Sequence, residues 1–268
     1  MINEVSISNY KSIFRQRFSL SRLNVFVGRR GSGKTNILEA LGIAAAAHDD
    51  ALDADSLYKR GIAPVIPSLM VHWDRNKNRS NKEIEIVWHE RNSWKKAKLV
   101  CENPESIDAR WKDISWYEPS YIEKINNLIQ FISDGSIDGK YPFADESKNA
   151  VLNAAFRGSR NFRNYKIYNV VNEDNNLEEL EDSLFSNNNT PSIFAIDNLP
   201  SYIDSHMLAT FSQLAVKHNK QAFIATDNPA IVKDMNINDP SQKIFVVKMT
   251  QTGQTLVEEQ KNSTIVEI

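Results

Sequence analysis

The segment 28–35, GRRGSGKT, constrains the fold of this chain more than any other part of the sequence. It fits the pattern G-x-x-x-x-G-K-[ST], in which glycines let backbone N–H groups curl around phosphates at the start of a helix. An apolar run at 23–27 precedes it, and an Ala- and Leu-rich run at 36–47 follows. Strand, glycine loop and helix therefore occur in the order that such a loop requires, and we predict an α/β fold that binds a nucleoside triphosphate.

Individual residues of this loop have distinct predicted roles. The ammonium group of Lys34 is predicted to reach the β and γ phosphates of ATP, and the hydroxyl of Thr35 to bind Mg²⁺. The alternative is a chance match in a glycine-containing turn. The residues of this segment that we predict to contact the nucleotide are Arg29, Arg30, Gly31, Ser32, Gly33, Lys34, Thr35 and Asn36.

A second informative segment lies far downstream. Residues 192–197, SIFAID, form an apolar run that ends in the carboxylate of Asp197. The carboxyl ends of strands in α/β sheets border the crevice where ligands bind, so we predict that Asp197 holds Mg²⁺ across from Thr35. The alternative is a surface aspartate that closes a strand. Residues 204–217 predict a helix and 221–225 another strand, which together fit a parallel crossover.

The middle of the chain predicts two insertions in a single domain that spans residues 1–268. Three apolar-rich pieces separated by charged turns occur at about 68–100 and indicate an antiparallel β-arm. Apolar residues recur at helical spacing in 119–133 and 144–156, so we expect a helical lobe at about 105–165.

Composition narrows the class of protein. Of the 268 residues, 41% are hydrophobic, which is enough for a sizeable core. The net charge of −2 gives no general basic field for nucleic acid or for an anionic membrane. The single cysteine, Cys101, excludes an internal disulfide and a cysteine-based zinc site. No segment is long and apolar enough to span a bilayer, so we expect a soluble cytoplasmic protein without a membrane partner.

The chain resembles a known family near both of its ends. The similarity is to the ABC-type ATPases of the SMC/RecF group and to the related OLD-like AAA proteins. The matching segments are ISNYKS at 7–12, LNVFVGRRGSGKTNILEAL at 23–41, IDNLPSYID at 196–204, ATDNP at 225–229 and the tail at 243–247 with Gly253 and Thr255. The resemblance implies an ABC-ATPase-like head with a mixed or parallel sheet.

The same resemblance implies partners. Heads of this type sandwich ATP between two subunits, so a homodimer or a higher homo-oligomer is implied. Lys11 matches a basic residue of the family that approaches a phosphate. Many standalone relatives control nucleic-acid metabolism or defence against phage, which implies a separate effector protein by analogy alone.

Departures from the family pattern affect hydrolysis more than binding. Asn198 stands where the family has a glutamate that orients the attacking water, and Asp227 stands where it has a histidine that senses the γ-phosphate. No clear L-S-G-G-Q signature precedes Asp197. With Lys34, Asp197 and Asn198 as the implied catalytic positions, we predict a nucleotide-dependent switch or scaffold with weak or partner-dependent hydrolysis. The alternatives are an active DNA-stimulated ATPase and a non-catalytic module with a vestigial loop.

Residues 156–166, FRGSRNFRNYK, interleave basic and aromatic side chains. One interpretation is a nucleic-acid contact in which Phe162 or Tyr165 stacks on bases, and another is an arginine supplied to the triphosphate of a neighbouring subunit. The more common arrangement is a solvated face whose aromatic side chains pack inward. A nucleic-acid partner therefore stays open at this point.

Overall fold

A computed structural model gives the structure of the chain. The residues that it describes are 1–63, 65–74, 79–80, 83–101, 103–106, 109, 111–115, 160–169, 184–185, 191–199, 205–232, 235–236 and 238–261. No helix in these ranges is long and apolar enough to cross a membrane.

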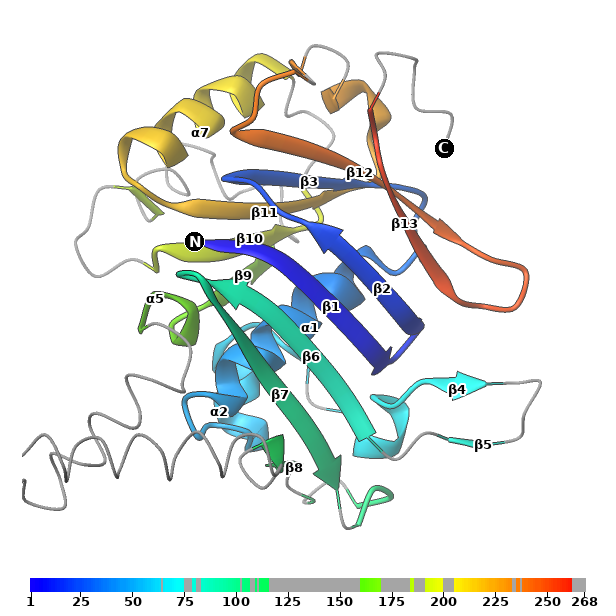
Figure 1. Cartoon of the computed structure of the whole chain (residues 1–268). Helices are drawn as coiled ribbons and strands as arrows, with labels where there is room; N and C mark the ends of the chain where they lie inside the picture. The colour runs from blue at the N-terminus through cyan, green and yellow to red at the C-terminus, as the bar shows by residue number, and fades with distance from the viewer. Residues whose placement is uncertain are drawn as a thin grey trace, which may run out of the picture.

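An antiparallel sheet of five strands forms one side of the molecule, in the order β2-β1-β6-β7-β8 (Figure 1). β6 alternates buried residues with partly exposed ones, because one face of the strand packs on the core and the other is open toward solvent. The bounds are β1 Ile2–Tyr10, β2 Ile13–Ser19, β6 Glu83–Glu90, β7 Ser93–Cys101 and β8 Trp111–Asp113.

A mixed sheet of six strands lies beside it, in the order β13-β12-β3-β11-β10-β9 (Figure 1). Neighbouring strands from β12 to β9 run parallel, and only β13 is antiparallel to its neighbour. β3, β10 and β11 are buried along their whole length, as parallel strands covered on both faces require. The bounds are β3 Leu23–Val27, β9 Lys166–Asn169, β10 Ile193–Asp197, β11 Gln221–Thr226, β12 Gln242–Met249 and β13 Thr255–Glu259.

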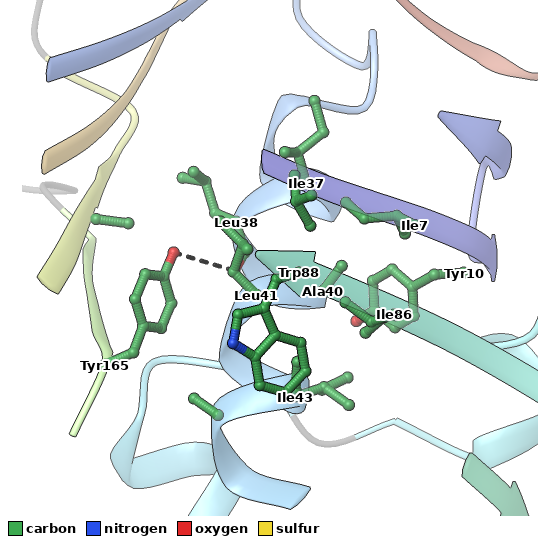
Figure 2. Packing of buried hydrophobic residues seen from close by; sticks show 14 of the residues in the cluster. Ile7, Tyr10, Ile37, Leu38, Ala40, Leu41, Ile43, Ile86, Trp88 and Tyr165 are labelled. Carbon is green, nitrogen blue, oxygen red and sulfur yellow. Dashed lines mark hydrogen bonds between the residues drawn. The ribbon is translucent and has the colours of Figure 1, made fainter. Parts of the chain in front are cut away.

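Helix α1 (Lys34–Ala47) lies between the two sheets, and every residue from Ile37 to Ala47 is buried. The small side chains of its alanine-rich half let both sheets approach the helix closely. Figure 2 shows large side chains from the two sides meeting around α1, and Tyr165 donates a hydrogen bond from its hydroxyl to the Leu38 carbonyl at 3.1 Å. This layer carries the larger hydrophobic core.

Helix α7 (Ser205–Lys217) covers the opposite face of the six-stranded sheet (Figure 1). Its buried residues Leu208, Phe211 and Ala215 pack in a second core with Phe194 and Ile196 of β10. The predicted helix at 204–217 and the predicted strand at 221–225 are therefore present, and β11 pairs parallel with β10 as the crossover requires.

The segment at about 68–100 differs in detail from the predicted arm. Its last two pieces are β6 and β7, which pair antiparallel with each other, but β6 also pairs with β1. The first piece contains a short 3-10 helix, η1 (Pro67–Leu69), and a single bridge between Tyr10 and Val71. These strands extend the N-terminal sheet because their buried faces complete the core around α1.

Several short elements complete the described chain. They are α2 Ala54–Lys59, β4 Trp73–Asp74, β5 Arg79–Ser80, α5 Arg160–Arg163 and the 3-10 helix η5 Pro229–Val232. The predicted helices at 119–133 and 144–156, and with them most of the helical lobe, lie outside the described residues. The division of the chain into a single domain with two insertions stays a prediction.

Candidate nucleotide-binding site

The loop between β3 and α1 takes the left-handed backbone conformation at two glycines. Gly31 has φ 81° and Gly33 has φ 100°, and Gly33 is the N-cap residue of α1. An L-residue with a side chain disfavours this region of φ by roughly 1–2 kcal/mol. The glycine pattern of the sequence is therefore explained by the path of the backbone, which places the amides at the N-terminus of α1.

Lys34 is folded onto the loop itself. Its Nζ donates to the carbonyl oxygens of Gly28 at 2.8 Å and Arg29 at 3.0 Å, and the residue is only 7% exposed. Burial lowers the pKa of Lys34, and the nearby carboxylates of Asp227 and Asp197 oppose that shift. An ammonium group is thus held at the loop, with negative charges across from it.

Asp197 faces α1 because of the two-residue period of β10. Ile193 and Ala195 point into the core around α1, whereas Phe194 and Ile196 point toward α7, so the next residue in the alternation lies on the α1 side. Its Oδ2 accepts a hydrogen bond from Thr35 Oγ1 at 2.8 Å. The two residues predicted to bind Mg²⁺ are therefore in direct contact.

The carboxylate of Asp197 is desolvated. The residue is 2% exposed, and burial raises its pKa, against the hydrogen bonds from Thr35 and from the Asn198 backbone and the charge of Lys34. The Asn198 N–H donates to Asp197 Oδ1 at 3.1 Å, so both oxygens have a donor. A buried carboxylate of this kind costs stability unless a cation compensates its charge.

The oxygen set fits a magnesium ion. Mg²⁺ binds oxygen ligands at about 2.1 Å with octahedral angles, so two adjacent ligands lie about 3 Å apart. The 2.8 Å between Thr35 Oγ1 and Asp197 Oδ2 matches that spacing. Mg²⁺ is usually held by one or two protein oxygens together with phosphates and waters. The described residues contain no group of three or more His, Cys, Asp or Glu that could hold a metal alone.

Asn198 and Asp227 follow the ends of two neighbouring strands. Asn198 has a left-handed φ of 57°, and its Nδ2 donates to Asn169 Oδ1 at 3.3 Å. The side chain is thereby directed toward β9. Asp227 is exposed directly after β11. The sequence resemblance implies a glutamate and a histidine at these two positions, and Asn198 and Asp227 stand there instead.

The other predicted contact residues occupy different environments. Arg29 and Arg30 are exposed, and Ser32 is 3% exposed. Ser32 Oγ has no hydrogen-bond partner in the part of the chain that the structure describes. Lys11 forms an ion pair with Glu39 of α1, so its ammonium group has a protein partner.

Sequence reasoning missed two residues beside the loop. Ser12 receives a hydrogen bond from Asn36 Nδ2 at 2.6 Å, and Thr255 donates to the Ser32 carbonyl at 3.2 Å. Both lie in the segments that resemble the family, but no local pattern marks a serine in a hairpin turn or a threonine at a strand start as a loop contact. Only the tertiary structure brings them there.

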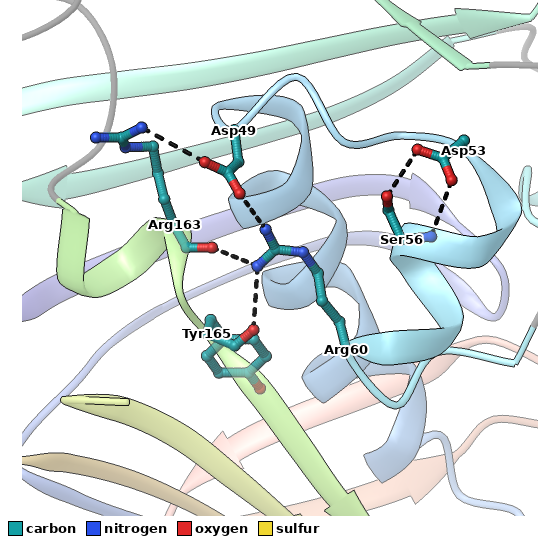
Figure 3. Close-up of polar contacts among 6 residues, drawn as sticks. All are labelled: Asp49, Asp53, Ser56, Arg60, Arg163 and Tyr165. Carbon is teal, nitrogen blue, oxygen red and sulfur yellow. Dashed lines mark hydrogen bonds and ion pairs between the residues drawn. The ribbon is translucent and has the colours of Figure 1, made fainter. Parts of the chain in front are cut away.

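In the described part of the basic and aromatic segment, residues 160–166, the aromatic side chains pack inward. Phe162 and Tyr165 are fully buried, so the proposed stacking of either ring on bases is wrong for this structure. Arg163 pairs with Asp49 at 3.4 Å, and Arg60 pairs with the same carboxylate at 2.7 Å (Figure 3). Arg60 also donates to the carbonyl oxygens of Arg163 and Tyr165. The interpretation with inward aromatic side chains holds for Phe162 and Tyr165, because both rings complete the core around α1.

Comparison with solved structures supports the fold. The SMC head domain from Thermotoga maritima has a TM-score of 0.51 and 13% sequence identity, and the match covers 97% of this chain and 99% of that one. A second SMC head, bound to the C-winged helix domain of ScpA, has a TM-score of 0.50 and 12% identity, with 97% of each chain covered. Identities this low establish the fold alone.

Comparison with protein families covers nearly the whole sequence. The model of the AAA ATPase domain family matches residues 1–265. No curated protein matches the chain. The glycine loop, the Thr35–Asp197 contact and the two-sheet architecture all agree with this match. The chain therefore belongs to the AAA ATPase domain family and is a P-loop ATPase with the fold of an SMC head.

Proposed function

We propose that this chain binds Mg·ATP at the loop and works as a nucleotide-dependent switch with slow hydrolysis. The observation that carries the proposal is the contact between Thr35 and Asp197, with Lys34 on the loop carbonyls beside it. A phosphate group offers Lys34 a stronger, charge-assisted partner than two carbonyl oxygens. The hydroxyl of Ser32, which has no hydrogen-bond partner among the described residues, adds a buried donor at the same loop.

Each residue contributes a separate part of the binding. Loop amides and Lys34 hold the phosphate oxygens, and Thr35 and Asp197 hold the metal. When bound, Mg²⁺ offsets the charge that develops on the phosphates during transfer. Because the Asp197 carboxylate is buried, a cation there offsets the cost of burying its charge. The same Mg²⁺ would also bind the phosphates, so ATP and Mg²⁺ are expected to bind cooperatively.

Slow hydrolysis follows from Asn198. A carboxamide does not accept a proton from the attacking water, so the chain lacks the general base that the family places there. The hydrogen bond from Asn198 to Asn169 also directs the amide toward β9. The bound state is therefore expected to persist, which suits a switch better than a motor.

We extend the proposal to assembly. ATP is proposed to join two copies of the chain into a homodimer or a higher homo-oligomer, and the assembled form is proposed to act on a separate effector protein. An SMC head of this fold is bound to a winged-helix domain of ScpA, which shows that such a head can carry a protein partner. Control of a nucleic-acid-directed or anti-phage effector in the cytoplasm, as in the OLD-like group, is the specific form of the proposal.

Mass photometry with and without Mg·ATP, beside a phosphate-release assay, tests this function. We expect Mg·ATP to shift the protein from monomer to dimer with turnover well below one per second, and Lys34→Ala to lose both binding and assembly. Rapid turnover that rises with added DNA would instead show a DNA-stimulated motor. Calorimetry that detects no binding at millimolar Mg·ATP would show that the loop is vestigial.

A further inference from the structure

A chain of hydrogen bonds ties the phosphate loop to two distant segments. Asn36 Nδ2 donates to Ser12 Oγ at 2.6 Å, and the hydroxyl oxygens of Ser12 and Thr255 lie 2.6 Å apart. Thr255 Oγ1 donates to the Ser32 carbonyl oxygen at 3.2 Å. Ser12 lies in the turn between β1 and β2, and Thr255 is the first residue of β13.

The direction of this chain is fixed by the chemistry of its ends. An amide NH₂ can only donate and a carbonyl oxygen can only accept. Thr255 therefore gives its proton to Ser32, and Ser12 gives its own proton to Thr255. Each hydroxyl accepts one hydrogen bond and donates one. This series of hydrogen bonds starts at Asn36 in α1 and ends at Ser32 in the loop, so it closes around the loop. We call the four residues Ser12, Ser32, Asn36 and Thr255 the clasp.

The strands that carry this clasp pack tightly against the loop. A Cβ built on Gly33 would lie 1.9 Å from Thr255 Oγ1, and one on Gly28 would lie 2.1 Å from the Val247 carbonyl oxygen. Val247 and Thr255 belong to the antiparallel ribbon β12–β13 (Figure 1). Thr255 is only 2% exposed, so water cannot easily replace its hydroxyl as a donor.

The clasp also fixes the orientation of one peptide group. The bond between Ser32 and Gly33 is trans, so the Gly33 N–H points in the direction opposite to the Ser32 carbonyl. Because Thr255 holds that carbonyl toward the ribbon, the Gly33 N–H is turned away from the ribbon. Backbone N–H groups of this kind are the groups with which glycine loops bind phosphate.

We propose that Thr255 and Ser12 are positioning residues for the phosphate loop, and that they couple the ribbon β12–β13 to nucleotide binding. This inference rests on the proposed binding of ATP. The two hydroxyls hold the Ser32–Gly33 peptide in the orientation that receives phosphate, so the protein does not have to order this peptide when ATP binds. Movement of the ribbon would in turn change the affinity of the loop.

The test compares Thr255→Val with Thr255→Ser. Valine keeps the shape of the side chain and removes the hydroxyl, whereas serine keeps the hydroxyl. We expect Thr255→Val to bind Mg·ATP about five- to tenfold more weakly and the loop amides of the nucleotide-free protein to exchange hydrogen faster, by a similar factor. Thr255→Ser should restore both values to near those of the wild type.

Two further variants decide whether the clasp acts as a unit. Ser12→Ala, at a half-buried turn, removes the hydroxyl in the middle of the hydrogen-bond series. We expect the same loss of Mg·ATP affinity and of amide protection as in Thr255→Val, with no further loss in the double variant. This variant also carries the test if Thr255→Val does not fold. Thr252→Val, at the exposed turn of the same ribbon, should behave as the wild type.

Three results would overturn the proposal. These are unchanged affinity and exchange in both Thr255→Val and Ser12→Ala, an equal loss in Thr252→Val, or losses that multiply in the double variant. Hydrogen exchange of the loop amides, measured without nucleotide, separates the proposed function from the proposed role of the clasp. If the wild type binds no ATP but Thr255→Val still loosens the loop, the proposed function fails while the clasp stands.

Discussion

Asn198, the residue after Asp197, offers the clearest test of slow hydrolysis. Asn198→Glu supplies the missing carboxylate, and since a positioned general base contributes about 10²–10⁴-fold, we expect phosphate release to rise at least roughly tenfold. Asn198→Gln is the matched control because it carries the same strain at φ 57° without a base. Equal rates in the two variants would show that residue 198 does not limit hydrolysis.

Two loop glycines separate backbone strain from steric contact. Both have positive φ, but a Cβ on Gly31 would meet nothing within 4 Å, whereas one on Gly33 would collide with Thr255. We expect Gly31→Ala to lower the free energy of unfolding by about 1 kcal/mol and Gly33→Ala by about 2–4 kcal/mol. Urea unfolding measures both values. Similar losses in the two variants would mean that the ribbon β12–β13 moves easily to make room for a side chain at residue 33.

The buried carboxylate of Asp197 predicts a dependence on pH. Burial raises its pKa in the folded state, so the folded protein binds more protons than the unfolded one between the two pKa values. Its contribution to stability therefore falls as pH rises through this window, and the full penalty applies above the folded pKa. Without nucleotide, Asp197→Asn should be more stable than the wild type at pH 7, and the difference should shrink as the pH is lowered toward the ordinary aspartate value.

The same variant should lose the metal. We expect Mg²⁺-dependent ATP binding to weaken roughly tenfold or more, because an amide is a poorer ligand for Mg²⁺. Urea unfolding across a pH series, together with calorimetry with and without EDTA, measures the two effects. A variant that is less stable at neutral pH and still binds Mg·ATP normally would contradict this account of Asp197.

At the scale of elements, one buried side chain joins the two sheets. Gln221 of β11 accepts from the Ile2 N–H at 2.8 Å and donates to the carbonyl oxygens of Ile2 and Ser21, each at 2.7 Å. Gln221→Leu removes all three of these hydrogen bonds, and of the three backbone groups the Ser21 carbonyl oxygen keeps a donor in Asn24 Nδ2 at 2.8 Å, so we expect a loss of about 2–4 kcal/mol in urea unfolding. Gln213→Leu on the exposed face of α7 is the control and should change stability by less than about 0.5 kcal/mol.

The elements also show where sequence patterns have limits. The helix at 204–217 and the strand at 192–197 were predicted well because a single period of burial governs each one. The apolar-rich pieces that became β6 and β7 predicted strands correctly, but they could not show that β6 pairs with β1. Pairing depends on which buried faces meet around α1, and no local window contains that information.

At the scale of the whole molecule, nucleotide binding should appear as added thermal stability. A ligand that binds only the folded state at 100 times its Kd adds about 2.7 kcal/mol, which in a chain of this size raises Tm by roughly 5 °C or more. We expect this shift with Mg·ATP, a smaller one with ATP and EDTA, and none in Lys34→Ala. Differential scanning calorimetry at several ATP concentrations measures it, and a shift that Lys34→Ala retains would place the nucleotide elsewhere.

The sequence by itself determined the phosphate loop, its flanking strand and helix, and the carboxylate at the end of a second buried strand. These features are local, because a few neighbouring residues fix the backbone path and the burial period. The sequence also predicted Asp197 across from Thr35. The tertiary structure alone decided that β6 pairs with β1, that the rings of Phe162 and Tyr165 are buried, and that Ser12 meets Thr255 across 243 positions. Such contacts are chosen by the mutual burial of distant faces and by satisfaction of buried donors, which only the assembled sheets around α1 impose.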